Sequence, residues 1–198
     1  KPSRLQWWLV FNAGILLVAL VWLVRSDFEQ PQDRSDVLWK MFIWPIAPLC
    51  ATAILFNQHL GLSAVWRCIA GMASGTITFL VLEILLGAYL DQSSVVLASL
   101  MASVSFAQWM VRNGCRGDVF RAILGNLVEC DDGFTLPIRL AIGGSWCATY
   151  FIALDWGTRW QVWPFSCVAG TCSGYWVGVL CLFLAENCAS YKFITVNK

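Results

Sequence analysis

The sequence predicts an all-helical membrane protein, a bundle of six transmembrane helices with short loops in a single domain. Hydrophobic residues make up 59% of the 198 positions and charged residues only 13%, whereas soluble domains carry about 25% charged residues. Long charge-free stretches also recur, each close to the roughly 20 residues that a helix needs to cross a bilayer. Six such helices occupy about 120 residues, which leaves no room for a folded soluble domain.

The charge balance excludes several classes of protein. Lys and Arg number 13 and Asp and Glu number 12, a net charge of +1. A nucleic-acid-binding protein needs a basic surface, and a disordered chain needs low hydrophobicity. We therefore expect membrane lipids around the chain and no nucleic-acid partner.

The first three spans are bounded by polar segments. The stretch WWLVFNAGILLVALVWLV predicts a first span over about residues 6–24. A second is expected over 41–58, and the segment NQHLGLSAVWR at 57–67 is expected to turn the chain back. The third span, over about 68–90, contains one acid, Glu83.

The last three spans are predicted in the same way. A fourth covers about residues 93–111 and a sixth covers about 162–185. The fifth, over about 136–154, begins with Pro137, which a first helical turn tolerates, and carries Arg139, which can snorkel toward the interface. A re-entrant fifth segment would reduce the count to five spans.

Basic residues predict the orientation, because Lys and Arg concentrate in cytoplasmic loops. With the N-terminus inside, the cytoplasmic set holds Lys1, Arg4, Arg67, Arg112, Arg116, Arg121, Arg139, Lys192 and Lys198. The outer set then holds only Arg25, Arg34, Lys40 and Arg159. This asymmetry predicts that both termini are cytoplasmic.

Residues suited to catalysis or metal binding are scarce. The nine cysteines form no Cys-x-x-C pair, which is the usual zinc-binding pattern, and most fall inside spans where a thiol acts as a small apolar side chain. The single histidine, His59, is expected to be a polar residue at a span end. We expect no metal site, no cofactor and no catalytic residue in this chain.

Glu83 is the acid that falls inside a predicted span. An ionisable residue in a membrane helix usually faces a protein interior or a water-filled cavity. In such a position, Glu83 would contact a lipid headgroup or a partner helix. Alternatively, Glu83 lies near the outer interface, before Gly87, and snorkels toward water.

Small residues recur at helical spacing in two spans. The sixth contains Gly170, Gly174 and Gly178, and the third contains Gly71 and Gly75. This Gly-x-x-x-Gly spacing removes side chains from one helix face, so another helix can approach its backbone closely. The spacing does not decide whether that helix is internal or belongs to another protein.

The turn before the sixth span, LDWGTRWQVWP, is rich in tryptophan. It contains Trp156, Trp160 and Trp163, and Asp155 and Arg159 can pair across it. Tryptophan is enriched at membrane interfaces because its ring is apolar and also donates a hydrogen bond. The turn is either an aromatic anchor or a docking surface on the outer face.

This turn and the glycine-spaced span after it resemble the PIG-F family, the small subunit of ethanolamine phosphate transferases in glycosylphosphatidylinositol (GPI) anchor synthesis. The close resemblance covers residues 154–179, LDWGTRWQVWP followed by FSCVAGTCSGYWVGV. The matching positions are Asp155, Trp156, Trp160, Gln161, Trp163, Pro164, Gly170, Gly174 and Gly178.

The resemblance implies a non-catalytic subunit in the endoplasmic reticulum membrane that stabilises a large catalytic partner. That partner would carry a lumenal metal-dependent domain, with zinc as the expected metal. It would move phosphoethanolamine from phosphatidylethanolamine to a mannose of the GPI precursor. The alternative is a stand-alone membrane enzyme or lipid transporter, with Glu83, Asp155 and Arg159 along a headgroup path.

Overall fold

The computed structural model describes residues 4–29, 46–51, 53, 62–114, 135–153 and 163–196 of the 198-residue chain. Within these ranges the chain is helical and forms no strand. The labelled helices are α1 Arg4–Glu29, α3 Leu62–Leu85, α4 Gln92–Val104, α5 Phe106–Asn113, α7 Thr135–Ala153 and α8 Phe165–Val196. Residues 46–51 form a further short helical segment.

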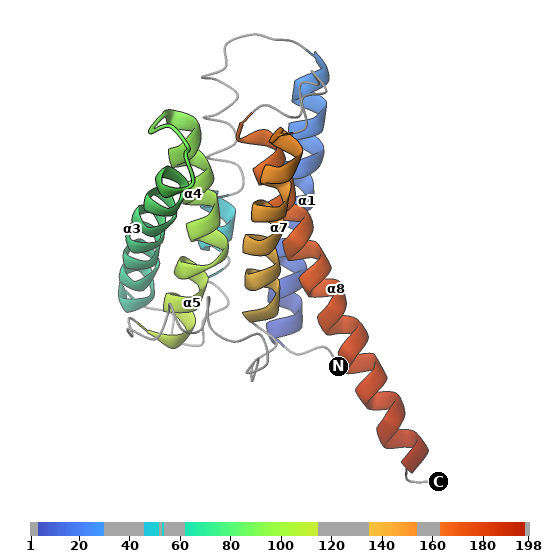
Figure 1. The fold of residues 1–198 in the computed structure, drawn as a ribbon. Coiled ribbons are helices and arrows are strands. Elements are labelled where there is room, and N and C mark those ends of the chain that lie inside the picture. The colour runs from blue at the N-terminus through green and yellow to red at the C-terminus, as the bar shows by residue number, and fades with distance from the viewer. Residues whose placement is uncertain are drawn as a thin grey trace.

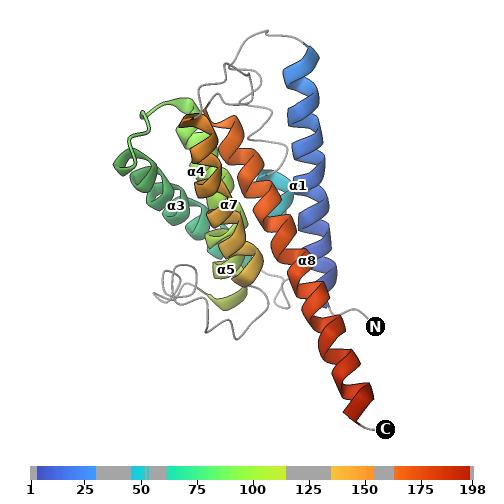
Figure 2. The ribbon, with the colours of Figure 1, turned by 45° about the vertical axis from the view of Figure 1, so that its right-hand side comes forward.

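The helices run up and down around a central pair, α4 with α5 (Figure 1). In the most apolar 18-residue stretch of Gln92–Asn113, 89% is buried inside the structure, whereas the corresponding stretches of α3 and α8 are 28% and 39% buried. α3 packs against α4 and α5, α7 packs along α8, and α1 lies against α8. The start of α1 and the end of α8 lie at the same end of the bundle (Figure 2).

Three of the described helices are long and apolar enough to cross a membrane. They are Leu62–Leu85, Gln92–Asn113 and Phe165–Ala185, judged by length and composition alone. The all-helical prediction is therefore confirmed for the described part of the chain. The six-span bundle remains a prediction, and most of the expected second span, 41–58, lies outside the described residues.

α3 ends at Leu85, five residues before the expected end of the third span. Gly87 has φ +94°, and its N–H donates to the Ile84 carbonyl at 3.0 Å, while the Ala88 N–H donates to the Glu83 carbonyl at 2.9 Å. This pair of bonds is a Schellman motif, in which a glycine with positive φ closes a helix. The apolar residues 86–90 therefore belong to the turn between α3 and α4.

The other end of α3 and the end of α8 also differ from the expected spans. Residues 62–67 were expected in a turn, yet they form the first turns of α3. A single charge such as Arg67 does not interrupt a helix. α8 continues past residue 185 to Val196, and its 32 residues make a rod about 48 Å long. The helix is therefore longer than a bilayer core, which is about 30 Å thick. The end of α8 projects beyond the bundle (Figures 1 and 2).

The fourth span, expected to be continuous, is broken at Ser105. This residue has φ −120° and ψ −83° and separates α4 from α5. Its hydroxyl donates to the Met101 carbonyl, and the Ser103 hydroxyl donates to the Leu100 carbonyl at 2.7 Å. Serine hydroxyls that bond back to the preceding turn often bend helices.

α1 is tied to α8 by a hydrogen bond as well as by packing. The Trp176 indole N–H of α8 donates to the Ala13 carbonyl at 2.9 Å. Leu16 of α1 and Tyr175 of α8 are fully buried in the same apolar core. The first helix is therefore anchored along the middle of the last one.

Candidate functional site

The glycine stripe of α8 is filled by α7 of the same chain. A Cβ on Gly170 would lie 2.6 Å from the Ala148 Cβ, and one on Gly174 would lie 2.7 Å from the Leu140 carbonyl carbon. A Cβ on Gly178 would meet the backbone of Pro137. All three glycines therefore allow close backbone approach between α7 and α8.

The shorter stripe of α3 is filled by the start of α5. A Cβ on Gly71 would lie 2.6 Å from the Ala107 Cα, and one on Gly75 would lie 2.8 Å from the Phe106 Cβ. The structure thus places both stripes on internal contacts. In this structure neither stripe is open to a helix of another protein.

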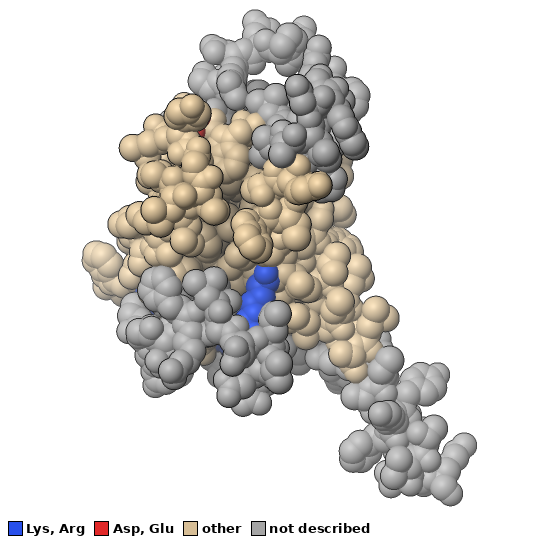
Figure 3. Space-filling view, in the orientation of Figure 1, with Lys and Arg blue, Asp and Glu red and all other residues tan. Residues whose placement is uncertain are grey.

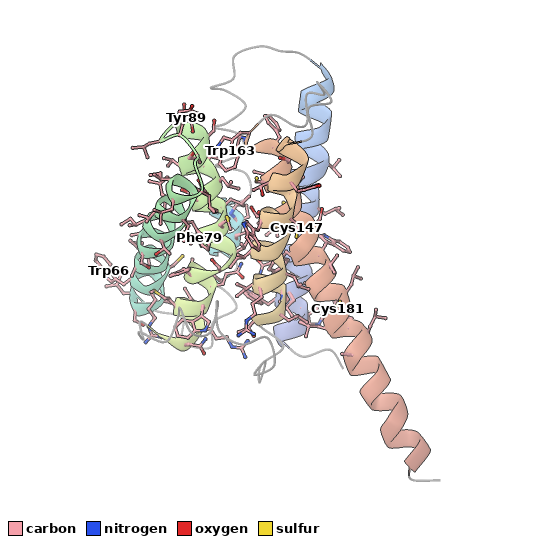
Figure 4. The ribbon with its side chains drawn as sticks, in the orientation of Figure 1. Trp66, Phe79, Tyr89, Cys147, Trp163 and Cys181 are labelled. Atoms are coloured by element: carbon pink, nitrogen blue, oxygen red, sulfur yellow. The ribbon has the colours of Figure 1, made fainter. Side chains whose placement is uncertain are left out.

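Two residues of the tryptophan-rich turn, Trp163 and Pro164, are described, and Trp163 contacts the start of α4. The Trp163 indole N–H donates to the Ser94 hydroxyl oxygen at 3.3 Å, and the Ser94 hydroxyl donates to the Tyr89 carbonyl at 2.7 Å. Trp163 and Tyr89 lie at the same end of the bundle (Figure 4). Pro164 is buried, and the peptide bond before it is cis.

The remaining predicted residues of that turn lie outside the described part of the chain. They are Asp155, Trp156, Arg159, Trp160 and Gln161. Their roles therefore stay predictions.

The start of α4 is fixed at this end of the bundle by Asp91. The Asp91 carboxylate accepts a hydrogen bond from the Ser94 N–H at 2.9 Å, which caps the helix. Ser94 therefore contacts Asp91, Tyr89 and Trp163, and is the residue through which the α3–α4 turn meets the segment before α8. The adjacent serines and the Asp-x-x-Ser spacing were a signal for this cap in the sequence.

Glu83 points into the bundle in the last turn of α3. Only 7% of its surface is exposed, and within the described residues neither carboxylate oxygen has a hydrogen-bond partner. Asp91, also an acid, lies within electrostatic range of this carboxylate. The side chain therefore lies inside the bundle and does not snorkel outward. Its role as a contact for a lipid or a partner helix stays a prediction.

The first turn of α8 brings further polar groups to this end. Ser166 is 5% exposed, and its hydroxyl has no partner among the described residues. Cys167 is fully buried, lies near Ser145 of α7, and is within electrostatic range of Glu83. We call Glu83, Asp91, Ser94, Ser166 and Cys167 the polar end cluster.

Sequence reasoning identified only Glu83 of this cluster as a site residue. Cys167 was assigned as an apolar filler, and Ser166 was not considered separately. The cluster depends on residues far apart in the chain, so no local pattern predicts it. In the described residues no three metal-binding side chains come together.

Charge is rare on the face of the described residues that Figure 3 shows. On this face acidic atoms lie near the end that carries the α3–α4 turn, and basic atoms lie in the opposite half. The basic residues whose side chains the structure describes are Arg67, Arg112 and Arg139, at the start of α3, the end of α5 and the start of α7, respectively. These arginines are at the end of the bundle opposite the polar end cluster.

Replacing Trp163 by phenylalanine is expected to lower the free energy of unfolding by about 1 kcal/mol, because the ring stays and the donor to Ser94 is lost. The matched control is Trp146→Phe on α7, where the ring is 67% exposed. Unfolding of both variants would be followed by circular dichroism in detergent. Equal losses would contradict a stabilising role for the Trp163–Ser94 bond.

Comparisons with known proteins agree with the resemblance found in the sequence. Over 37 residues the chain is 46% identical to proteins of Mus musculus and Homo sapiens, each named GPI ethanolamine phosphate transferase, stabilizing subunit. The matched segment covers 19% of this chain and only 17% of each relative. No solved structure matches the chain significantly.

The model of the family described as GPI biosynthesis protein family Pig-F matches residues 37–182. This range includes every described helix except α1 and the last part of α8. Since the match spans well over half of the sequence, the chain belongs to the Pig-F family of GPI biosynthesis proteins.

Proposed function

We propose that this chain is a non-catalytic subunit that stabilises a GPI ethanolamine phosphate transferase. The family match over residues 37–182 carries the proposal, because it extends across most of the helices. The two relatives are themselves named as stabilizing subunits of that transferase. The catalytic partner would move phosphoethanolamine from phosphatidylethanolamine to a mannose of the GPI precursor, using a metal ion, expected to be zinc, in its own domain.

The proposed setting is the endoplasmic reticulum membrane, with six spans and both termini in the cytoplasm. The bundle's two chain ends lie on one side, which is compatible with an even number of crossings (Figure 1). In this orientation the α3–α4 turn and the start of α8 face the lumen. The polar end cluster then lies on the side where the partner's catalytic domain is expected.

Affinity purification of the tagged full-length chain from membranes in mild detergent tests the subunit role. A large membrane protein with a metal-dependent transferase domain is expected to copurify with it. Depleting the chain should lower the amount of that protein and its phosphoethanolamine transfer, and restoring the chain should recover both. Purifying the chain alone, stable and without a partner, would contradict the proposal.

The competing function, an enzyme or lipid transporter acting alone, predicts a different result. The buried position of Glu83 is the observation that favours it, since a transport path needs polar groups inside the bundle. The isolated chain would be reconstituted in liposomes and assayed for phosphoethanolamine transfer and lipid flipping. Activity without the partner would favour this function over the subunit role.

A further inference from the structure

The polar end cluster contains two buried side chains whose polar atoms have no partner among the described residues. Glu83 is 7% exposed with two unpartnered carboxylate oxygens, and Ser166 is 5% exposed with one unpartnered hydroxyl. Most buried polar groups in proteins are hydrogen-bonded, so two unpartnered groups at one place require an explanation.

The two side chains come from helix ends that lie at the same end of the bundle (Figure 1). Glu83 belongs to the last turn of α3, and Ser166 belongs to the first turn of α8. The Trp163 indole N–H donates to the Ser94 hydroxyl oxygen, and the Ser94 hydroxyl donates to the Tyr89 carbonyl in the turn after α3. These bonds place the start of α8 at the end of the bundle that carries Glu83, and Cys167 lies within electrostatic range of its carboxylate. Asp91 adds a second negative charge nearby.

Among the basic residues whose side chains the structure describes, none is placed to balance these acids. These residues are Arg67, Arg112 and Arg139, and all belong to the opposite end of the bundle. A buried carboxylate without a cation is costly, and acids inside membrane proteins commonly pair with a charged group or mark a ligand site. The cluster is thus suited to bind a cation that the described residues do not supply.

We propose that Glu83 and Ser166 form a binding site for a primary ammonium group, supplied by the headgroup of an ethanolamine phospholipid. An ammonium group carries three N–H donors, and the two Glu83 oxygens with the Ser166 hydroxyl offer three acceptors. The ammonium chemistry follows from the cluster itself. The choice of ethanolamine as its source rests on the proposed function.

The depth of the site fits a lipid headgroup. Glu83 lies two residues before the end of α3, and the turn after it exposes Leu86, Tyr89 and Leu90. Exposed apolar and aromatic residues at the end of a span are typical of the interfacial region, where headgroups lie. Choline headgroups have no N–H donor, so the site should select phosphatidylethanolamine over phosphatidylcholine.

The test uses the full-length chain in nanodiscs that contain equal amounts of phosphatidylethanolamine and phosphatidylcholine. Native mass spectrometry would measure the ratio of the two lipids retained by the protein. Wild type is expected to retain phosphatidylethanolamine preferentially, and Glu83→Gln should reduce that preference about tenfold or more, because a charged hydrogen-bond partner is lost. Excess free ethanolamine is then added to distinguish the lipid from a soluble source of the same ammonium group. If the lipid headgroup occupies the site, the free amine should compete with it and lower the amount of phosphatidylethanolamine retained.

Two serines of α8 provide a matched pair. Ser166→Ala removes an unpartnered buried hydroxyl of the site, whereas Ser173→Ala removes an exposed one. The first should weaken the preference for phosphatidylethanolamine, and the second should leave it unchanged. Circular dichroism of each variant would show that the helices are intact.

Three outcomes would overturn the proposal. Wild type would show no lipid preference, Glu83→Gln would keep the wild-type preference, or free ethanolamine would bind without displacing any phosphatidylethanolamine. If Glu83→Gln abolished copurification of the large subunit while the lipid ratio stayed the same, a basic side chain of the partner would be the occupant instead. A lipid preference in a wild-type chain that copurifies with no partner would support the ammonium site and contradict the subunit role.

Discussion

Gly144→Ala is expected to lower the free energy of unfolding by about 2 to 3 kcal/mol, whereas Gly143→Ala, one residue earlier, should not destabilise the chain. A Cβ on Gly144 would meet the carbonyl group of Gly170 and lie 3.1 Å from the Gly174 Cα, all of it backbone that cannot rotate away. A Cβ on Gly143 would have nothing within 4 Å. That substitution should instead stabilise α7 by up to about 1 kcal/mol, because alanine is the better helix former.

The measurement is the unfolding midpoint of each variant in detergent, titrated with dodecyl sulfate and followed by circular dichroism. The two substitutions add the same methyl group to the same helix, so any difference between them reports the contact with α8. Similar midpoints for both variants would contradict the close packing of α7 on α8. Gly174→Ala should resemble Gly144→Ala, since its Cβ would meet the Leu140 carbonyl group.

The glycine stripes illustrate how far the sequence can predict a membrane fold. Their spacing predicts a helix face open to close backbone approach, and each stripe is such a face. The spacing contains no information about which helix fills it, because any helix with a compatible surface can approach. Only the assembled chain places Gly174 against Leu140 and Gly71 against Ala107.

Some helix ends have a local cause in the sequence, and others depend on packing between helices. The end of α3 was open to prediction, since Gly87 can adopt the positive φ that closes a helix. The break at Ser105 was not, because it occurs where α3 lies against the start of α5 and no proline or glycine marks it. The hydrogen bond from the Ser105 hydroxyl and the packing of α3 against the start of α5 both occur at this break.

The candidate site shows the same limit. Glu83 was recognisable because one acid in a long apolar stretch is conspicuous. The rest of the polar end cluster was not, since Ser94 and Ser166 come from two other helices and serines are common in apolar spans. Trp163 was selected from the turn motif, yet its contact with Ser94 requires two turns at the same end of the bundle.

Phe106→Ala is expected to lower the free energy of unfolding by about 3 kcal/mol or more, because it leaves a cavity between α3 and α5. Phe106 is 1% exposed, covers Gly75, and contacts Phe79 edge to face with ring centroids 5.7 Å apart. Phe79 points from α3 toward the central helices (Figure 4). Neighbouring side chains can close such a cavity only partly, since the interior is closely packed.

The matched control is Ile77→Ala, on the exposed face of α3, where 64% of the side chain is accessible. Lipid tails are as apolar as the side chain they would replace, so this truncation should change the free energy of unfolding by less than about 0.5 kcal/mol. Both variants would be unfolded in the same lipid–detergent mixture. A large loss for Ile77→Ala would mean that the exposed face of α3 is covered by protein, and a small loss for Phe106→Ala would mean that α3 and α5 are not packed as the structure has them.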